Sequence, residues 1–171
     1  MINEANHIID FVSAIQSDCK EVFLPPEAGL NAPGQSVIPV ALVKGTRGYI
    51  ERVAHQVNGC YDNGWFDACA VMIRRLLETL IIETFESQKI ASKIKDGKGD
   101  FYFLSELIRL TLAESSWNLT RNSKIALPKL KDIGDKSAHS RRYHAVRNDL
   151  DRLLPEIRVV VQELIYLAGL K

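Results

Sequence analysis

The feature that most constrains the fold is the segment over residues 65–88, in which apolar side chains occupy most of the circumference of an α-helix. A helix that is apolar on nearly every side must be covered by other elements, so we expect this segment to be the central helix. The Asp-Asn-Gly turn signal at residues 62–64 marks the place where it begins. Trp65 and Trp117 are expected to be core anchors.

Most of the remaining chain also shows helical periodicity. Further helices are expected over residues 3–23, 46–61, 101–113, 119–130 and 143–167. The connections after residue 45 are short, which predicts an all-α fold, an antiparallel bundle of about five to six helices. Pro128 is expected to disturb the helix in which it lies, and Pro155 to kink or restart the last one.

Residues 24–45 interrupt this pattern with a long loop rich in proline and glycine. Within it, the apolar run over residues 37–43 is expected to pack extended over the core, with a short strand weakened by Pro39. We therefore predict one domain over residues 1–171. Residues 1–45 form its N-terminal helix and loop, and residues 46–171 form its bundle core.

Several classes of protein are excluded by missing motifs. No apolar run approaches the roughly 20 residues of a membrane-spanning helix, and the N-terminus lacks the basic region of a signal peptide. The three cysteines have no paired spacing. Zinc-binding, nucleotide-binding and serine-nucleophile motifs are absent, so no metal or cofactor is expected. A reducing cytoplasm is the expected location, without membrane contact.

The formal net charge of +1 hides an uneven distribution. Residues 121–149 hold eight lysines and arginines against three aspartates, a local charge of +5 that leaves −4 for the rest. His139 and His144 lie in the same stretch. Such a cluster could contact phosphates or support acid–base chemistry, or it could be a solvated surface with helix-end charges.

Two arginines and a glutamate lie within the apolar central helix. Arg74 and Glu78 are four residues apart and Arg75 and Glu78 are three apart, so either pair can meet on one helix face. One interpretation is an internal ion pair that orients the neighbouring helices. The other is that one arginine faces a site shared with His139.

Two segments carry a resemblance to a known family. Residues 59–78 are similar to an alanine-rich helix that ends in an Arg–Leu–Glu signature, here Arg75-Leu76-Leu77-Glu78. Residues 133–139, Ile-Gly-Asp-Lys-Ser-Ala-His, are similar to a Gly-Asn-x-Ala-Ala-His turn. Together, over roughly residues 46–168, they resemble the HEPN superfamily of small helical domains. The nearest match is a bacterial clade often appended to restriction subunits and other defence proteins.

The resemblance implies a helical bundle that dimerises. Many HEPN domains are metal-independent ribonucleases of toxin–antitoxin, CRISPR and abortive-infection systems, and others bind RNA or dock proteins without activity. Active members carry an arginine four to six residues before a histidine. The histidine can move the 2′-OH proton of RNA while the arginine stabilises charge on the phosphorane.

At the positions where that arginine would precede His139, this sequence has Asp132, Ile133 and Gly134. The catalytic candidates are therefore His139 with a distant arginine, Arg74 or Arg75. Alternatively, His139 ties the turn to a neighbouring helix. The candidates for contact with RNA or a partner are Lys131, Lys136, Arg141, Arg142, His144 and Arg147. The structural candidates are Glu78, Gly134 and Asp135.

Three functional hypotheses remain. The first is a HEPN-like homodimeric module of a bacterial defence or toxin–antitoxin type system that binds RNA or a partner protein. The second is a metal-independent endoribonuclease that uses His139 with an arginine from Arg74, Arg75, Arg141 or Arg142. The third is a structural oligomerisation subunit.

Overall fold

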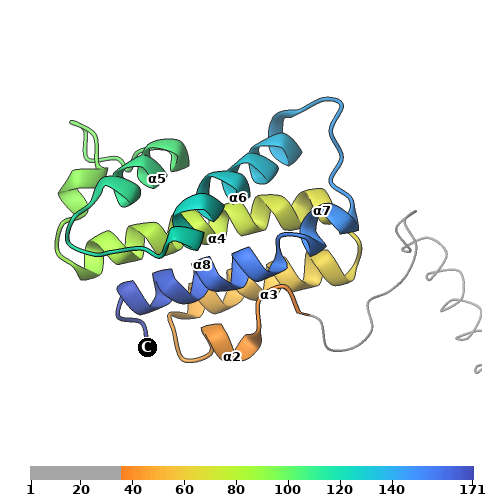
Figure 1. Cartoon of the computed structure of the whole chain (residues 1–171), viewed down its shortest axis with the longest axis horizontal. Helices are drawn as coiled ribbons and strands as arrows, with labels where there is room; N and C mark the ends of the chain where they lie inside the picture. Colours follow the sequence, from red (N-terminus) through yellow and green to blue (C-terminus); the bar gives the residue numbers. More distant parts are fainter. Residues whose placement is uncertain (1–35) are drawn as a thin grey trace, which may run out of the picture. The chain divides into compact units, whose positions relative to one another are not determined.

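The computed structural model of the protein describes residues 36–171, and all the regular elements in that range are helices joined by loops (Figure 1). The all-α prediction is confirmed, and no strand occurs between residues 36 and 171. The predicted helix over residues 3–23 and the first part of the predicted loop lie outside the described residues. The elements are α2 (Val40–Val43), α3 (Gly48–Asp62), α4 (Phe66–Ser87), the 3-10 helix η1 (Ala91–Ile94), α5 (Leu104–Ala113), α6 (Arg121–His139), α7 (Arg147–Asp151) and α8 (Leu154–Leu167).

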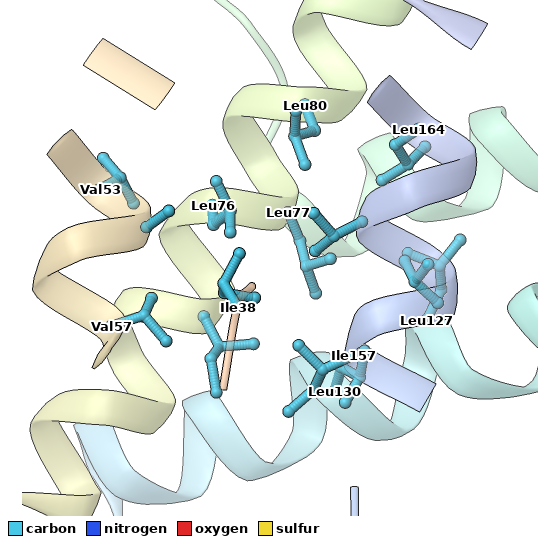
Figure 2. Packing of buried hydrophobic residues seen from close by; sticks show 14 of the residues in the cluster. Ile38, Val53, Val57, Leu76, Leu77, Leu80, Leu127, Leu130, Ile157 and Leu164 are labelled. Carbon is cyan, nitrogen blue, oxygen red and sulfur yellow. The ribbon is translucent and has the colours of Figure 1, made fainter. Parts of the chain in front are cut away.

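Helix α4 is the central element, as its apolar circumference predicts. It contacts α3, η1, α5, α6, α7 and α8. Figure 1 shows α3 and α6 running in the direction opposite to α4, and α8 running with it. Figure 2 shows Leu76, Leu77 and Leu80 of α4 among side chains of the neighbouring elements. The labelled neighbours are Ile38, Val53, Val57, Leu127, Leu130, Ile157 and Leu164.

The segment that leads into α2 packs over the core. Val37 and Ile38 are fully buried, and the side chain of Asn58 forms two hydrogen bonds with the backbone of Ile38. Val37 and Ile38 therefore pack on the core as expected, but the rest of the run does not pack as an extended segment or a strand, because Val40–Val43 is a short helix. Pro39 lies directly before that helix with φ −55°, a backbone angle already suited to a helix start.

Helix α6 is much longer than the sequence predicts. Residues 119–130 were expected to form a short helix followed by a turn, yet one helix continues through Pro128 to His139. Its buried residues recur along one face of the helix as far as Ile133 and Gly134. Burial of this face outweighs the helix-breaking cost, which is about 3 kcal/mol for an interior proline and about 1 kcal/mol for a glycine.

The last predicted helix is divided, as Pro155 predicts. Helix α7 ends at Asp151, and α8 restarts at Leu154 with Pro155 in its first turn. Proline is tolerated there because the first N–H groups of a helix have no partner within it. Ile157, Val160 and Leu164 are fully buried, so their seam faces the core of the same chain.

The two tryptophans have different surroundings. Trp117 meets the ring of Phe85 edge to face at 4.9 Å and donates its ring N–H to the Thr111 carbonyl. Trp65, by contrast, is 54% exposed at the start of α4, so its predicted role as a core anchor is wrong. No helix within residues 36–171 has both the length and the hydrophobicity needed to cross a bilayer.

Candidate functional site

Helices α4 and α6 approach each other most closely at Gly134. A Cβ atom at this position would lie 2.7 Å from Cβ of Arg74 and 3.0 Å from the Ala70 carbonyl oxygen. Real Cβ atoms do not tolerate the shorter of these distances, so the crossing requires glycine. Gly134 thus lies inside α6 and allows α4 to approach closely, whereas the sequence predicts it in a turn.

Asp135 joins the two helices beside this crossing. Its carboxylate accepts a hydrogen bond from Nε of Arg74 at 2.7 Å and also pairs with Lys131 one turn earlier on α6. Burial alone would raise the pKa of Asp135, but the hydrogen bonds from Lys131 and Arg74 outweigh it and hold this pKa below its usual value. Asp135 is therefore a charged link between α4 and α6.

The ion pair expected within α4 does not form. Glu78 is half-buried, and it pairs with neither Arg74 nor Arg75 in the part of the chain that the structure describes. Arg74 instead turns to Asp135 on α6, while Arg75 is exposed. The four-residue spacing of Arg74 and Glu78 permits an ion pair, but Arg74 pairs with Asp135 on the neighbouring helix α6 instead.

His139 is the last residue of α6 and is exposed. Its predicted position, after a turn and near the start of the last helix, is wrong because α6 extends to it. No other side chain or backbone group among residues 36–171 holds its ring. Arg74 is thus joined to Asp135, four residues before His139, whereas the His139 side chain has no partner among the residues that the structure describes.

The residues that follow α6 form a turn, which we call the basic turn (residues 140–144). The Ser140 hydroxyl accepts hydrogen bonds from the backbone N–H groups of Arg142 at 3.4 Å and Tyr143 at 3.2 Å. The Tyr143 hydroxyl donates to Asp149 at 3.1 Å. These bonds order the backbone around Arg141 and Arg142, whose side chains are exposed and have no ion pair within the described residues.

Asp67 of α4 holds the C-terminal end of the basic turn. One carboxylate oxygen accepts a hydrogen bond from the backbone N–H of Ala145 at 2.8 Å, and the other lies 3.3 Å from Nδ1 of His144. Asp67 lies in the first turn of α4, where the helix dipole favours a negative charge. Sequence reasoning missed this residue, although an acid in a first helical turn is a recognisable signal.

Arg147 anchors α7 against the ends of α3 and α4. Its guanidinium lies 5.5 Å from the ring centre of Tyr61 and 5.6 Å from that of Phe66. The Tyr61 hydroxyl donates to Asp151, and burial, followed by this hydrogen bond, raises the pKa of Tyr61 to about 12. Arg147, predicted to contact a ligand, is thus engaged in holding the fold.

The basic residues predicted to form one cluster differ in the structure, because some pair with other groups of the protein and others do not. The four lysines of α6 all have partners on the protein: Lys124 with Asn118, Lys129 with Glu156, Lys131 with Asp135 and Lys136 with Asp132. Because residues 121–139 form one helix, its charges are spread over about 27 Å. The candidate site therefore narrows to the basic turn, in which two adjacent arginines are exposed.

No grouping of three or more histidine, cysteine, aspartate or glutamate side chains within residues 36–171 could hold a metal ion. The chain matches no family model, no curated protein and no solved structure. Among the described residues, the basic turn therefore carries the features from which a function can be inferred.

Proposed function

We propose that the protein is a HEPN-like helical module that binds RNA through the basic turn, within a bacterial defence or toxin–antitoxin type system. One observation carries the proposal. Arg141 and Arg142 are exposed, adjacent and without acidic partners among residues 36–171, on a turn that Ser140, Asp149 and Asp67 hold in place. The resemblance of residues 59–78 and 133–139 to HEPN motifs suggests the ligand class and the setting.

Arginine suits this role because its planar guanidinium can form two parallel hydrogen bonds to one phosphate. Two adjacent arginines on an ordered turn lose little backbone entropy when they bind, since hydrogen bonds already fix the turn. Single-stranded nucleic acid is a fitting ligand because its backbone presents successive phosphates to such cations.

The geometry favours binding over catalysis. A general base must be held near the proton that it removes, and His139 has no group among the described residues to orient its ring. Arg74, the distant arginine considered for phosphate stabilisation, is paired with Asp135. The proposed activity therefore requires no chemical step.

The proposal includes a homodimer. Ile125 and Val159 are 50% and 42% exposed and line one hollow of about 400 Å³ between α6 and α8. Tyr166, two turns further along α8, is 76% exposed. We call Ile125, Pro155, Val159 and Tyr166 the α6–α8 patch. Lys129 and Glu156 line the same hollow and pair with each other at 3.1 Å, so their charges compensate within one chain. A two-fold axis through the α6–α8 patch would bring the exposed apolar side chains of two copies together.

Light scattering tests this dimer. Val159→Glu is expected to yield a monomer, because it places a charge in the contact. Val40→Glu is the matched control, since Val40 on α2 is 49% exposed and lies outside the patch. A monomeric wild type, or a dimer unaffected by Val159→Glu, would refute the proposed interface.

Fluorescence anisotropy with a labelled 12-nucleotide single-stranded RNA tests the main proposal. Arg141→Ala/Arg142→Ala should weaken binding about tenfold, since it removes two charge-assisted contacts. The control Lys98→Ala/Arg121→Ala removes the same charge from exposed residues elsewhere in the bundle and should leave binding nearly unchanged. Equal losses in the two variants would mean that net charge, rather than the basic turn, drives binding.

Incubation of the protein with total RNA in EDTA tests the catalytic alternative. We expect intact RNA. Cleavage that disappears in His139→Ala, with an unchanged circular dichroism spectrum, would replace the binding module with a metal-independent endoribonuclease. If the wild type neither cleaves nor retains RNA, yet forms a stable dimer, the structural subunit is the better account.

A further inference from the structure

A second concave surface lies beside the basic turn, between α6 and α7. This hollow has a volume of about 320 Å³, and its lining includes Ile133 and Lys136 from α6, Tyr143 from the basic turn, and Arg152 and Leu153 after α7. Its volume is at the lower end of the range for small-ligand sites. Because Tyr143 belongs to both surfaces, a strand held by Arg141 and Arg142 can continue into the hollow.

Two of the three basic residues that line the hollow form ion pairs within the protein. Lys136 pairs with Asp132 at 2.7 Å, and Lys129 pairs with Glu156 at 3.1 Å. Arg152 is exposed and has no ion pair in the described part of the chain. A guanidinium without a carboxylate partner, at the rim of a hollow, is suited to a phosphate oxygen.

The two carboxylates that line the hollow, those of Asp132 and Asp149, also have partners within the protein. One oxygen of Asp149 accepts hydrogen bonds from the Val146 N–H and from the Tyr143 hydroxyl, both at 3.1 Å. Asp132 presents its carboxylate next to the Lys136 ammonium, so this pair offers an acceptor and a donor side by side. Every nucleobase has neighbouring donors and acceptors on its edge, which such a pair can match.

We propose that this hollow takes one nucleotide of the bound strand, with its phosphate on Arg152 and its base edge on the Asp132–Lys136 pair. The inference rests on the proposed RNA binding and adds a defined subsite to it. Leu153 and Ile133 supply apolar surface for the base, while the Tyr143 hydroxyl is fixed by Asp149.

An NMR titration of ¹⁵N-labelled protein with cytidine 5′-monophosphate tests the subsite. The nucleotide should shift the amide signals of Ile133, Lys136 and Leu153 in the wild type. Inorganic phosphate and cytidine, titrated separately, should produce weaker shifts, because each supplies only half of the contacts. Arg152→Ala should reduce the response to the nucleotide to the level seen with cytidine, whereas Arg141→Ala/Arg142→Ala should retain the full response.

The same variants in the RNA-binding assay separate this inference from the function on which it rests. Arg152→Ala should weaken binding of the 12-nucleotide RNA about fivefold. If RNA binding depends on Arg141 and Arg142 while Arg152→Ala behaves as the wild type and the nucleotide causes no shifts, the subsite is wrong and the RNA-binding function stands. If the wild type binds no RNA, the proposed function fails, and the nucleotide titration alone decides whether the hollow binds nucleotides.

Discussion

Ser137 carries a hydroxyl group that the fold buries without satisfying it. Its Oγ atom has no hydrogen-bond partner among residues 36–171. An unsatisfied buried polar group costs about 1–3 kcal/mol, and serine is also a weaker helix former than alanine. Ser137 lies in α6, two residues before His139, so it bears directly on the stability of the helix end that leads into the basic turn.

Ser137→Ala is therefore expected to stabilise the protein by about 1 kcal/mol. Ser123→Ala is the matched control, because Ser123 is buried in the same helix but its hydroxyl accepts a hydrogen bond from Thr120 Oγ1 at 3.3 Å. Urea denaturation of both variants measures the difference. A Ser137→Ala variant less stable than the wild type would show that the hydroxyl has a partner after all.

Asp135 gives the protein a stability contribution that depends on pH. Its pKa in the folded protein lies below the usual value of 3.8, so the folded state favours the carboxylate. The contribution is present above that usual value and is lost as the pH falls through the lowered pKa. In Asp135→Asn this contribution is absent at every pH. The difference in unfolding free energy between wild type and variant should shrink between pH 6 and pH 3, and a constant or growing difference would contradict the assignment.

Helix α6 shows what local sequence signals can and cannot predict. Pro128 and Gly134 are both common at helix ends and in turns, and they led to the prediction of a break. The glycine serves a different purpose, because α4 comes too close for any side chain at that position. Such a requirement depends on a helix about 60 residues earlier in the chain, so no local pattern reveals it.

Gly134→Ala is expected to destabilise the protein by about 1–3 kcal/mol, because the added methyl group would meet Arg74 and Ala70. Gly59→Ala in α3 is the control, since a Cβ at Gly59 meets nothing within 4 Å. That substitution should stabilise the helix by about 0.5–1 kcal/mol. Thermal unfolding of the two variants should shift in opposite directions, and a stabilised Gly134→Ala would refute the close crossing.

The central helix and the restart at Pro155 were predictable because both follow from periodicity and from the geometry of proline. The candidate site was predictable only in part. The charge of Arg141 and Arg142 makes them candidates from the sequence alone. Whether they have ion-pair partners depends on which acidic residues the fold brings near them. Arg74, in contrast, has an ion-pair partner, Asp135, which lies 61 residues away in the sequence and which no local pattern indicates.

For the whole molecule, the net charge of +1 is compatible with a local anion-binding surface. Several lysines of α6, among them Lys131 and Lys136, form ion pairs with acidic side chains of the protein. The basic turn retains two arginines without such pairs in the described residues. We therefore expect weak, salt-sensitive binding through few phosphate contacts, unlike the broad electrostatic surface of a strongly basic protein.

The dependence of RNA affinity on salt tests this account most directly. Each phosphate contact to a single strand contributes about −0.7 to the slope of log K against log salt concentration. Replacing both arginines in Arg141→Ala/Arg142→Ala should therefore make the slope shallower by about 1.4. The control Lys98→Ala/Arg121→Ala should retain the wild-type slope. A slope unchanged by the first variant, or reduced equally by both, would contradict the assignment of RNA binding to the basic turn.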